Sequence, residues 1–168
     1  MASSRFFALK STLVVSALLL VGPVSANWVS QGEHSVSFKA VGPGGLAIDG
    51  NGNDLALKEQ GDQFVATVGL NSLKTGIDLR DRHMKEKYLE TPKYPLAIFT
   101  FDKSKVSVPG EGDVEGKLQL HGVTKPVKVH YKVTGSDKTA TVSGLARINI
   151  KEFHIDVPSY LGVTVKPD

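Results

Sequence analysis

Five histidines are the side chains in this sequence with the widest range of possible chemistry: His34, His83, His121, His130 and His154. None of them shows the H-x-H or H-E-x-x-H spacing that is typical of zinc sites. The sequence contains no cysteine, which excludes thiol catalysis and thiolate metal sites, and it contains no G-x-S-x-G motif. We therefore predict no catalytic residue, no metal site and no cofactor, and expect that the protein is not an enzyme.

The densest group of polar residues lies in one long connection, Leu73–Phe101, with the sequence LKTGIDLRDRHMKEKYLETPKYPLAIFTF. A long connection in a small β domain is typical of a functional loop or a lid. Thr75 to Asp78 has the pattern of a helix start, with Asp78 as the candidate N-cap. A strand, apolar on both faces, is predicted at Leu96–Phe101. It is either buried on both sides or lines a cavity.

The first 26 residues have the pattern of a secretory signal peptide. Two basic residues precede an apolar run at Leu13–Val21, Pro23 breaks that run, and Val24-Ser25-Ala26 offers a small-residue cleavage site. The run is too short to span a bilayer, which needs about 20 residues. We predict a signal peptide at 1–26 and a mature chain of 27–168 without a transmembrane segment. The mature chain has 18 basic and 17 acidic residues, so we predict no nucleic-acid partner.

The mature chain is a series of short alternating segments separated by glycine-rich turns. Asn27–Glu33 is predicted to be a polar tail. Regular spacing of such segments indicates an antiparallel barrel or sandwich in a single domain. The predicted strands are 34–40, 46–48, 55–58, 64–70, 96–101, 114–120, 127–133, 139–150 and 153–157, with 162–166 closing the chain.

An antiparallel barrel of about eight strands can be filled by side chains or can hold one small ligand. The residues expected to face inward are of both large and small types. Small inward residues either leave a cavity or pack against a large neighbour. The pattern leaves both outcomes open. The inward residues are Phe38, Phe64, Leu118 and Tyr131 among the large ones, and Ala40, Ala66 and Ala140 among the small ones.

Three segments together resemble the YceI family, the bacterial periplasmic lipocalin-like proteins that bind polyisoprenoids and other long-chain lipids. They are His34–Phe38 (HSVSF), Leu73–Met84 (LKTGIDLRDRHM) with KYP and FTF after it, and Gly116–Val127 (GKLQLHGVTKPV). The resemblance implies an all-β fold over 27–168: an extended eight-stranded antiparallel lipocalin-like β-barrel with a short helix at one end. It also implies a periplasmic location and a lipid chain in the hydrophobic interior.

The sequence departs from the family at Gly42–Gly52, GPGGLAIDGNG. Family members usually carry a second histidine and a G-x-F-x-x-F-x-G pattern here. Neither is present in this chain, so we expect a shorter, glycine-rich second strand.

The resemblance implies a set of lipid-binding residues from the barrel interior and from the long connection. The polar members of the connection have two interpretations. Arg80 and His83 either orient the ligand head group near a barrel opening, or join Asp81 in hydrogen bonds that lock the connection to the barrel wall. We favour the second interpretation for Asp81. The implied lipid-binding residues are His34, Val36, Phe38, Arg80, His83, Met84, Tyr88, Phe99, Phe101, Leu118, Leu120 and Phe153.

We expect a carrier or buffer for a long-chain amphiphile such as a polyisoprenoid, an isoprenoid quinone or a fatty-acid derivative. A filled barrel that acts as an envelope structural or interaction module is the alternative. An isoprenoid-modifying enzyme with His34, Arg80 and His83 is a third hypothesis. Lys125, Lys128 and Lys132 form either a basic strip for transient contact with an anionic membrane surface or, as we prefer, a solvated strand face. Family members can form homodimers.

Overall fold

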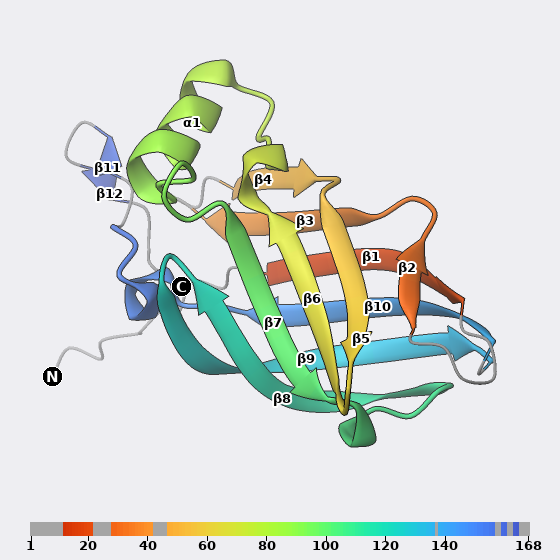
Figure 1. Cartoon of the computed structure of the whole chain (residues 1–168). Helices are drawn as coiled ribbons and strands as arrows, with labels where there is room; N and C mark the ends of the chain where they lie inside the picture. The colour runs from red at the N-terminus through yellow and green to blue at the C-terminus, as the bar shows by residue number, and fades with distance from the viewer. Residues whose placement is uncertain are drawn as a thin grey trace, which may run out of the picture.

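The structure is a computed structural model that describes residues 12–21, 28–41, 47–136, 138–156, 159–160 and 163–164. Antiparallel strands form one curled sheet, and a short helix, α1 (Asp78–His83), lies over one end of it (Figure 1). The strands of this sheet are β1 (Thr12–Val21), β2 (Val29–Gln31), β3 (Ser35–Val41), β4 (Ala47–Gly52), β5 (Leu55–Gln60), β6 (Gln63–Gly69), β7 (Leu96–Asp102), β8 (Gly110–Leu120), β9 (Val123–Gly135) and β10 (Thr139–Arg147).

The sheet closes into a barrel with eight strand positions. β2 and β3 pair with the same edge of β1, one after the other, and so occupy one position. β4 and β5 share the next position, because β4 pairs with β3 and β5 pairs with β2. From β5 the order runs through β6, β7, β8 and β9 to β10, and β10 pairs with the free edge of β1. The antiparallel lipocalin-like barrel that the resemblance implied is therefore confirmed, but one of its eight strand positions is taken by β1, which lies outside the predicted range 27–168.

Side-chain alternation positions the strands as predicted. In β9, Tyr131 and Val133 are buried, whereas Lys128, His130 and Lys132 are exposed. In β7, Ala97, Phe99 and Phe101 face the interior, so only one face of this apolar strand is turned inward. Of the two alternatives that the sequence left open for Leu96–Phe101, the structure shows the one in which one face lines a cavity.

Four short turns complete the fold. They are η2 (Leu70–Ser72), the π-helical turn η3 (Met84–Tyr88) directly after α1, η4 (Lys103–Lys105) and η5 (Ile150–Phe153). A separate two-stranded pairing joins β11 (Ser159–Tyr160) to β12 (Val163–Thr164).

Three local predictions were wrong. Val29–Gln31 is strand β2 rather than a tail, and it pairs with β1 and with Lys58. The predicted strand 153–157 begins instead as η5, and His154 after it has a positive φ of 56°, which breaks an extended run. Asp78 is the first residue of α1 and Ile77 occupies the cap position, with no side-chain cap hydrogen bond. The expected strand 46–48 corresponds to β4, whereas residues 42–46 lie outside the described residues.

Strand β1 coincides with residues for which the sequence predicts the apolar core of a signal peptide. Its backbone pairs with β10 on one side and with β2 and β3 on the other. Cleavage after Ala26 stays a prediction.

Candidate functional site

An apolar cavity of about 110 Å3 lies inside the curl of the sheet, between strands β5 to β10. Its wall is formed almost entirely by aliphatic and aromatic side chains. The lining residues are Leu55, Leu57, Ala66, Val68, Ala97, Phe99, Phe101, Val114, Leu118, Val127, Val129, Tyr131, Val142, Ser143, Gly144, Ala146 and Ile148. The sequence left open whether the barrel is filled, and the structure answers that it holds an internal cavity.

Small residues on adjacent strands make the space. Ala66 and Ala97 contribute methyl groups from β6 and β7, where larger side chains would close the gap. On β10, Gly144 lies opposite Tyr131 of β9, and a Cβ atom at Gly144 would come within 3.2 Å of a Val129 methyl group. Three aromatic rings lie around the cavity, and Phe99 stacks on Phe101 with ring centroids 5.3 Å apart.

The helix end of the barrel is closed by a packed core. Val36, Leu120 and Phe153 are buried there, and Phe153 is only 1% exposed. Met84 and Tyr88 from η3 pack against this core as partly buried side chains. The long connection therefore covers the end of the barrel with its apolar side.

Trp28 closes the opposite end and was missed by the sequence analysis. It packs against two buried clusters, one with the lining residue Leu57 and the other with the lining residues Val114 and Tyr131. Its backbone N–H donates to Glu59 Oε2 at 3.0 Å, and the Glu59 N–H donates to the Trp28 carbonyl at 3.0 Å. Burial acts to raise the pKa of Glu59, but hydrogen bonds from Lys103 and Trp28 and the Lys103 charge hold this pKa below its ordinary value. Trp28 is the only tryptophan in the chain, so it is an intrinsic reporter of the cavity.

Thr75, Arg80 and Asp81 form a closed hydrogen-bond group at the start of α1. Asp81 Oδ1 accepts from the Thr75 N–H at 2.7 Å and from the Thr75 hydroxyl at 2.5 Å. Arg80 donates from Nε to Thr75 Oγ1 at 2.7 Å and from Nη2 to the Thr75 carbonyl at 2.8 Å. Burial acts to raise the pKa of Asp81, yet these hydrogen bonds and the nearby cations hold it below its ordinary value. These hydrogen bonds join residues of the long connection to one another and none of the four reaches the barrel wall, so locking of the connection to the wall stays a prediction for Asp81 and Arg80.

His83 and His34 differ from this group. His83 is exposed at the end of α1, and within the described residues its ring makes no hydrogen bond. His34 lies between β2 and β3, and its Nδ1 is buried without a hydrogen-bond partner in the described part of the chain.

His121 has a structural position in the two-residue turn between β8 and β9. Its Nε2 lies 2.7 Å from Glu90 Oε2 and its Nδ1 lies 3.2 Å from the Phe153 carbonyl oxygen. The ring also meets Tyr94 edge to face, with centroids 4.5 Å apart. These contacts join the hairpin, the long connection and η5.

The twelve sequence-predicted residues thus fall into three groups. Phe99, Phe101 and Leu118 line the cavity. A second group closes the helix end and comprises Val36, Phe38, Met84, Tyr88, Leu120 and Phe153. The polar residues Arg80, His83 and His34 lie outside the lining. Their roles in lipid binding stay predictions.

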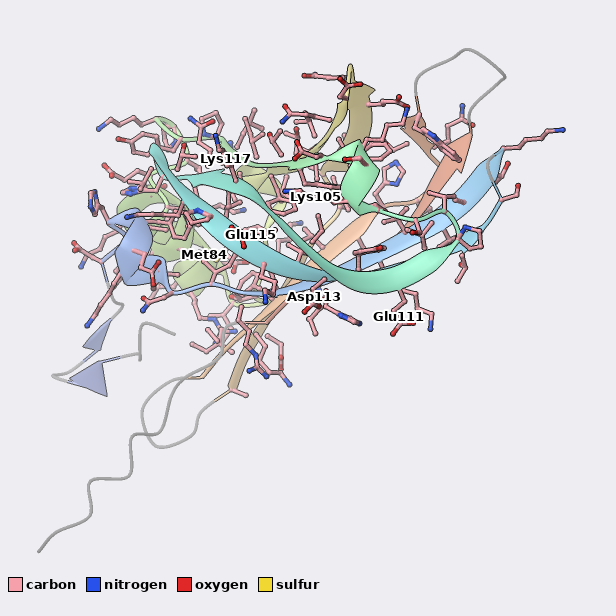
Figure 2. All side chains as sticks on the ribbon, turned by 90° about the horizontal axis from the view of Figure 1, so that it is seen from below. Met84, Lys105, Glu111, Asp113, Glu115 and Lys117 are labelled. Carbon is pink, nitrogen blue, oxygen red and sulfur yellow. The ribbon has the colours of Figure 1, made fainter. Side chains whose placement is uncertain are left out.

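The outer face of β8 and β9 carries matched charges. Figure 2 shows Glu111, Asp113 and Glu115 along β8. The Lys132 ammonium lies 3.0 Å from Glu111 Oε2, and His130 Nδ1 lies 2.9 Å from Asp113 Oδ1. Lys128 is the register partner of Glu115. Lys128 and Lys132 therefore lie beside acidic residues, whereas Lys125 is opposite Leu118; the two acidic partners favour a solvated strand face over a membrane-binding strip.

Two kinds of site are absent from the described residues, a metal-binding group and a membrane-spanning helix. No group of three or more His, Cys, Asp and Glu side chains there is arranged to hold a metal ion. None of the helices in that part of the chain is long and apolar enough to cross a membrane.

Comparisons with known proteins identify the family. The family model of the YceI-like domain matches residues 28–168. A UPF0312 protein of Pseudomonas savastanoi pv. phaseolicola is 30% identical over 171 residues, which cover 91% of this chain and 89% of that protein. A Salmonella arizonae protein named YceI is 35% identical over 104 residues, but the match spans 56% of this chain and 52% of that protein.

A solved structure has the same fold. A polyisoprenoid binding domain from Saccharophagus degradans, implicated in plant cell wall breakdown, superimposes with a TM-score of 0.52 at 16% sequence identity. The superposition covers 83% of this chain and 98% of that domain. With the family model covering residues 28–168, the chain belongs to the YceI-like domain family.

Proposed function

We propose that the protein is a carrier for a long-chain amphiphilic lipid, and that the apolar part of the lipid lies in the cavity between β5 and β10. Polyisoprenoids, isoprenoid quinones and fatty-acid derivatives are the candidate ligands. The cavity, with its almost wholly apolar wall, is the observation that carries this proposal. The polyisoprenoid-binding neighbour and the YceI-like domain family support a lipid-binding protein rather than an enzyme.

Energetics restrict the mechanism. Moving each methylene group from water into an apolar site stabilises the complex by about 0.8 kcal/mol, so a long chain partitions strongly out of water. From a bilayer the gain is near zero, because the chain already lies in an apolar medium. Selectivity then depends on the length and shape of the cavity and on a few polar contacts.

The size of the cavity sets how much of a chain fits without rearrangement. An apolar cavity of about 150 Å3 stays dry and takes up a benzene-sized hydrocarbon. The cavity here is of that order, about 110 Å3, so it accepts a short segment of a chain as it stands. A longer chain must displace side chains at one end, either Met84 and Tyr88 under the helix or Trp28 at the opposite end.

We also propose that the protein acts in the periplasm after cleavage behind Ala26. The signal-like pattern of residues 1–26 supports export, and the family match begins at residue 28, shortly after this point. A periplasmic carrier meets a membrane surface transiently when it loads and unloads. The domain assigned to this role is 27–168.

The test is lipid uptake reported by Trp28, with a fatty acid brominated along its chain as the probe. Bromine quenches tryptophan on contact, and Trp28 packs against clusters that contain the lining residues Leu57, Val114 and Tyr131. We expect saturable quenching in the wild type and at least a tenfold weaker affinity in Ala97→Leu, because leucine fills the cavity. Ala56→Leu is the matched control, since Ala56 lies on the other face of β5 and does not line the cavity. Equal affinity in the wild type and Ala97→Leu would refute the proposed site and favour the filled-barrel module.

A further inference from the structure

The helix end of the barrel carries most of the large apolar side chains that are exposed in the described part of the chain. Ile77 is 54% exposed, Leu79 is 59% exposed and Leu96 is 42% exposed. Among the described residues, the one other exposed side chain of this kind is Leu145 on β10. α1 and the start of β7 lie at the same end of the barrel (Figure 1). We call the exposed surface of residues 74–96 the helix-end face.

The apolar residues of the helix-end face are separate from the core beneath it. Met84 and Tyr88 of η3 pack against the core, whereas Ile77 and Leu79 belong to no buried cluster of the described residues and pack against none. A single exposed leucine is ordinary on a protein surface, but apolar residues that gather on one exposed element indicate a contact surface. The long connection therefore has two apolar sides, one turned to the core and one turned outward.

The net positive charge of residues 27–168 lies in the same connection. Residues 73–101 contain six basic and four acidic residues, whereas the rest of 27–168 contains 12 basic and 13 acidic residues. Arg80 is engaged by Thr75. The other five cationic side chains are in no salt bridge within the described residues; they are Lys74, Arg82, Lys85, Lys87 and Lys93. The helix-end face thus differs from the outer side of β8 and β9, where Lys132 and His130 have acidic partners.

Two of these lysines lie over tyrosine rings. Lys87 Nζ is 5.4 Å from the ring centroid of Tyr88, and Lys93 Nζ is 4.8 Å from the ring centroid of Tyr94. Tyrosine and lysine side chains are typical of segments at a membrane–water interface, because each has an apolar body and a polar or charged tip. The helix-end face therefore combines aliphatic, aromatic and cationic groups in the way that an interfacial segment does.

This combination specifies what the face would contact. Exposed aliphatic side chains gain from entering an apolar medium, and cations beside them gain from anions at its boundary. An anionic phospholipid surface supplies both, as acyl chains and as phosphate groups. A second copy of the chain fits less well, because a two-fold contact through this face would bring two basic surfaces together.

We propose that the helix-end face is a docking surface for an anionic phospholipid bilayer. Ile77 and Leu79 enter the headgroup region, and Arg82 and the neighbouring lysines contact lipid phosphates. Docking brings η3, whose Met84 and Tyr88 close this end of the barrel, next to the bilayer from which a lipid would load. This last consequence rests on the proposed carrier function, whereas docking itself does not.

The first test is sedimentation of the full chain with vesicles of phosphatidylcholine and phosphatidylglycerol in equal parts. We expect the wild type to bind these vesicles about tenfold more strongly than vesicles of phosphatidylcholine alone. Ile77→Ser with Leu79→Ser should weaken binding to the mixed vesicles about tenfold, because two apolar side chains are lost from the contact. Leu145→Ser is the matched control, since it removes an exposed leucine from β10, and it should bind as the wild type does.

The charged part of the face is tested with Lys74→Gln and Lys87→Gln together. Removal of two cations should weaken binding to the mixed vesicles about tenfold. The control is Lys128→Gln with Lys132→Gln, which removes the same charge from the outer face of β9 and should leave binding unchanged. Added salt should weaken wild-type binding, because it screens the charges. Equal losses in the two double variants would mean that net charge rather than this face drives binding, and would overturn the proposal.

A fluorescent label reports the contact directly, because the chain contains no cysteine. An environment-sensitive dye on Leu79→Cys should brighten and shift to the blue when the mixed vesicles are added. The same dye on Leu145→Cys should stay unchanged. This readout needs no loss of binding, so it decides the question even where a serine variant folds poorly. No change at position 79, or equal changes at both positions, would contradict docking through the helix-end face.

The outcomes keep docking and lipid carriage apart. Ala97→Leu fills the cavity and should still dock as the wild type does, so lost lipid uptake with intact docking bears on the carrier proposal alone. Lipid uptake without vesicle binding would overturn the docking proposal and leave the carrier proposal standing. A wild type that ignores the vesicles but forms a dimer, which Ile77→Ser with Leu79→Ser disrupts, would assign the face to a second copy and also overturn it.

Discussion

Thr75 joins the start of the long connection to α1 through hydrogen bonds with two side chains of the helix. Its hydroxyl donates to Asp81 and accepts from Arg80, while its N–H and carbonyl bond to the same two side chains. The R-D pair of the family-like motif is therefore explained by local structure. This arrangement fixes the orientation of α1, and the η3 turn that follows places Met84 and Tyr88 on the core.

We predict that Asp81→Asn lowers the free energy of unfolding by about 1–2 kcal/mol, because hydrogen bonds to a charged group are lost. Asp78→Asn is the matched control: it makes the same change in the same helix, but Asp78 is exposed and makes no side-chain cap bond. Thermal and urea unfolding measure both variants. Equal losses of unfolding free energy in Asp81→Asn and Asp78→Asn would contradict a stabilising role for the Asp81 hydrogen bonds.

The second residue-scale prediction concerns pH. Hydrogen bonds with Asp113 and Glu111 raise the pKa of His130 above its ordinary 6.5. The interactions of protonated His130 with Asp113 and Glu111 contribute stability that is fully present below pH 6.5. This stability is lost as the pH rises through the raised pKa of His130. Hydrogen bonds from Lys132 and His130 lower the pKa of Glu111 below 4.5, so its contribution is present above 4.5 and is lost as pH falls through the lowered value.

Titration of the His130 ring by NMR measures this shift. We expect Asp113→Asn to move the His130 pKa down toward its ordinary value, because Asp113 is the first cause of the shift. Glu115→Asn is the control, as Glu115 lies on the same face of β8 but pairs in register with Lys128. A His130 pKa that does not respond to Asp113→Asn would show that the surface charges do not interact in solution.

At the scale of elements, the β8–β9 hairpin explains the H-G pair of the L-H-G-V motif. A two-residue hairpin turn with the favoured twist needs positive φ at both central residues. His121 has φ of 51° and Gly122 has φ of 76°. His121 tolerates this conformation while its ring contacts Glu90 and the Phe153 carbonyl oxygen.

We predict that Gly122→Ala destabilises the protein more than Gly61→Ala. Both glycines have positive φ, so both variants carry the backbone cost of an alanine there, which is about 1 kcal/mol. Only at Gly122 would the added Cβ approach the Tyr94 ring, at 2.8 Å, whereas nothing lies within 4 Å at Gly61. Urea unfolding compares the two, and equal losses would mean that Tyr94 moves away at no cost.

The strands show where a sequence pattern is enough to predict an element of the fold. Period-two alternation located β6 and β9, because each has one face turned to the interior, whereas β7 was located by a run that is apolar on both faces. The same alternation misled at Phe153 and Ile155, since two buried residues flank an exposed one in a turn as well as in a strand. Trp28 was missed because it lies in a segment that is otherwise polar.

The candidate site was predictable in part for a related reason. Large apolar residues in a predicted strand are easy to recognise from the sequence, and Phe99, Phe101 and Leu118 do line the cavity. The space itself depends on Ala97, Gly144 and Ala146, and small residues carry no signal that separates a cavity wall from close packing. Ala140 shows the difference, because it is buried in one cluster with the lining residues Val114 and Tyr131 but does not itself line the cavity.

At the scale of the whole molecule, the cavity is bounded on three sides by identifiable parts of the chain. Met84 and Tyr88 cover the helix end, Trp28 covers the other end, and β1 pairs with β10 at the side.

Mass spectrometry of the purified protein, first native and then after solvent extraction, tests the central claim most directly. The carrier account predicts one long-chain apolar molecule per wild-type chain and none on Ala97→Leu. Wild-type protein that is bare, and that remains bare after exposure to isoprenoid and fatty-acid derivatives, would contradict the account.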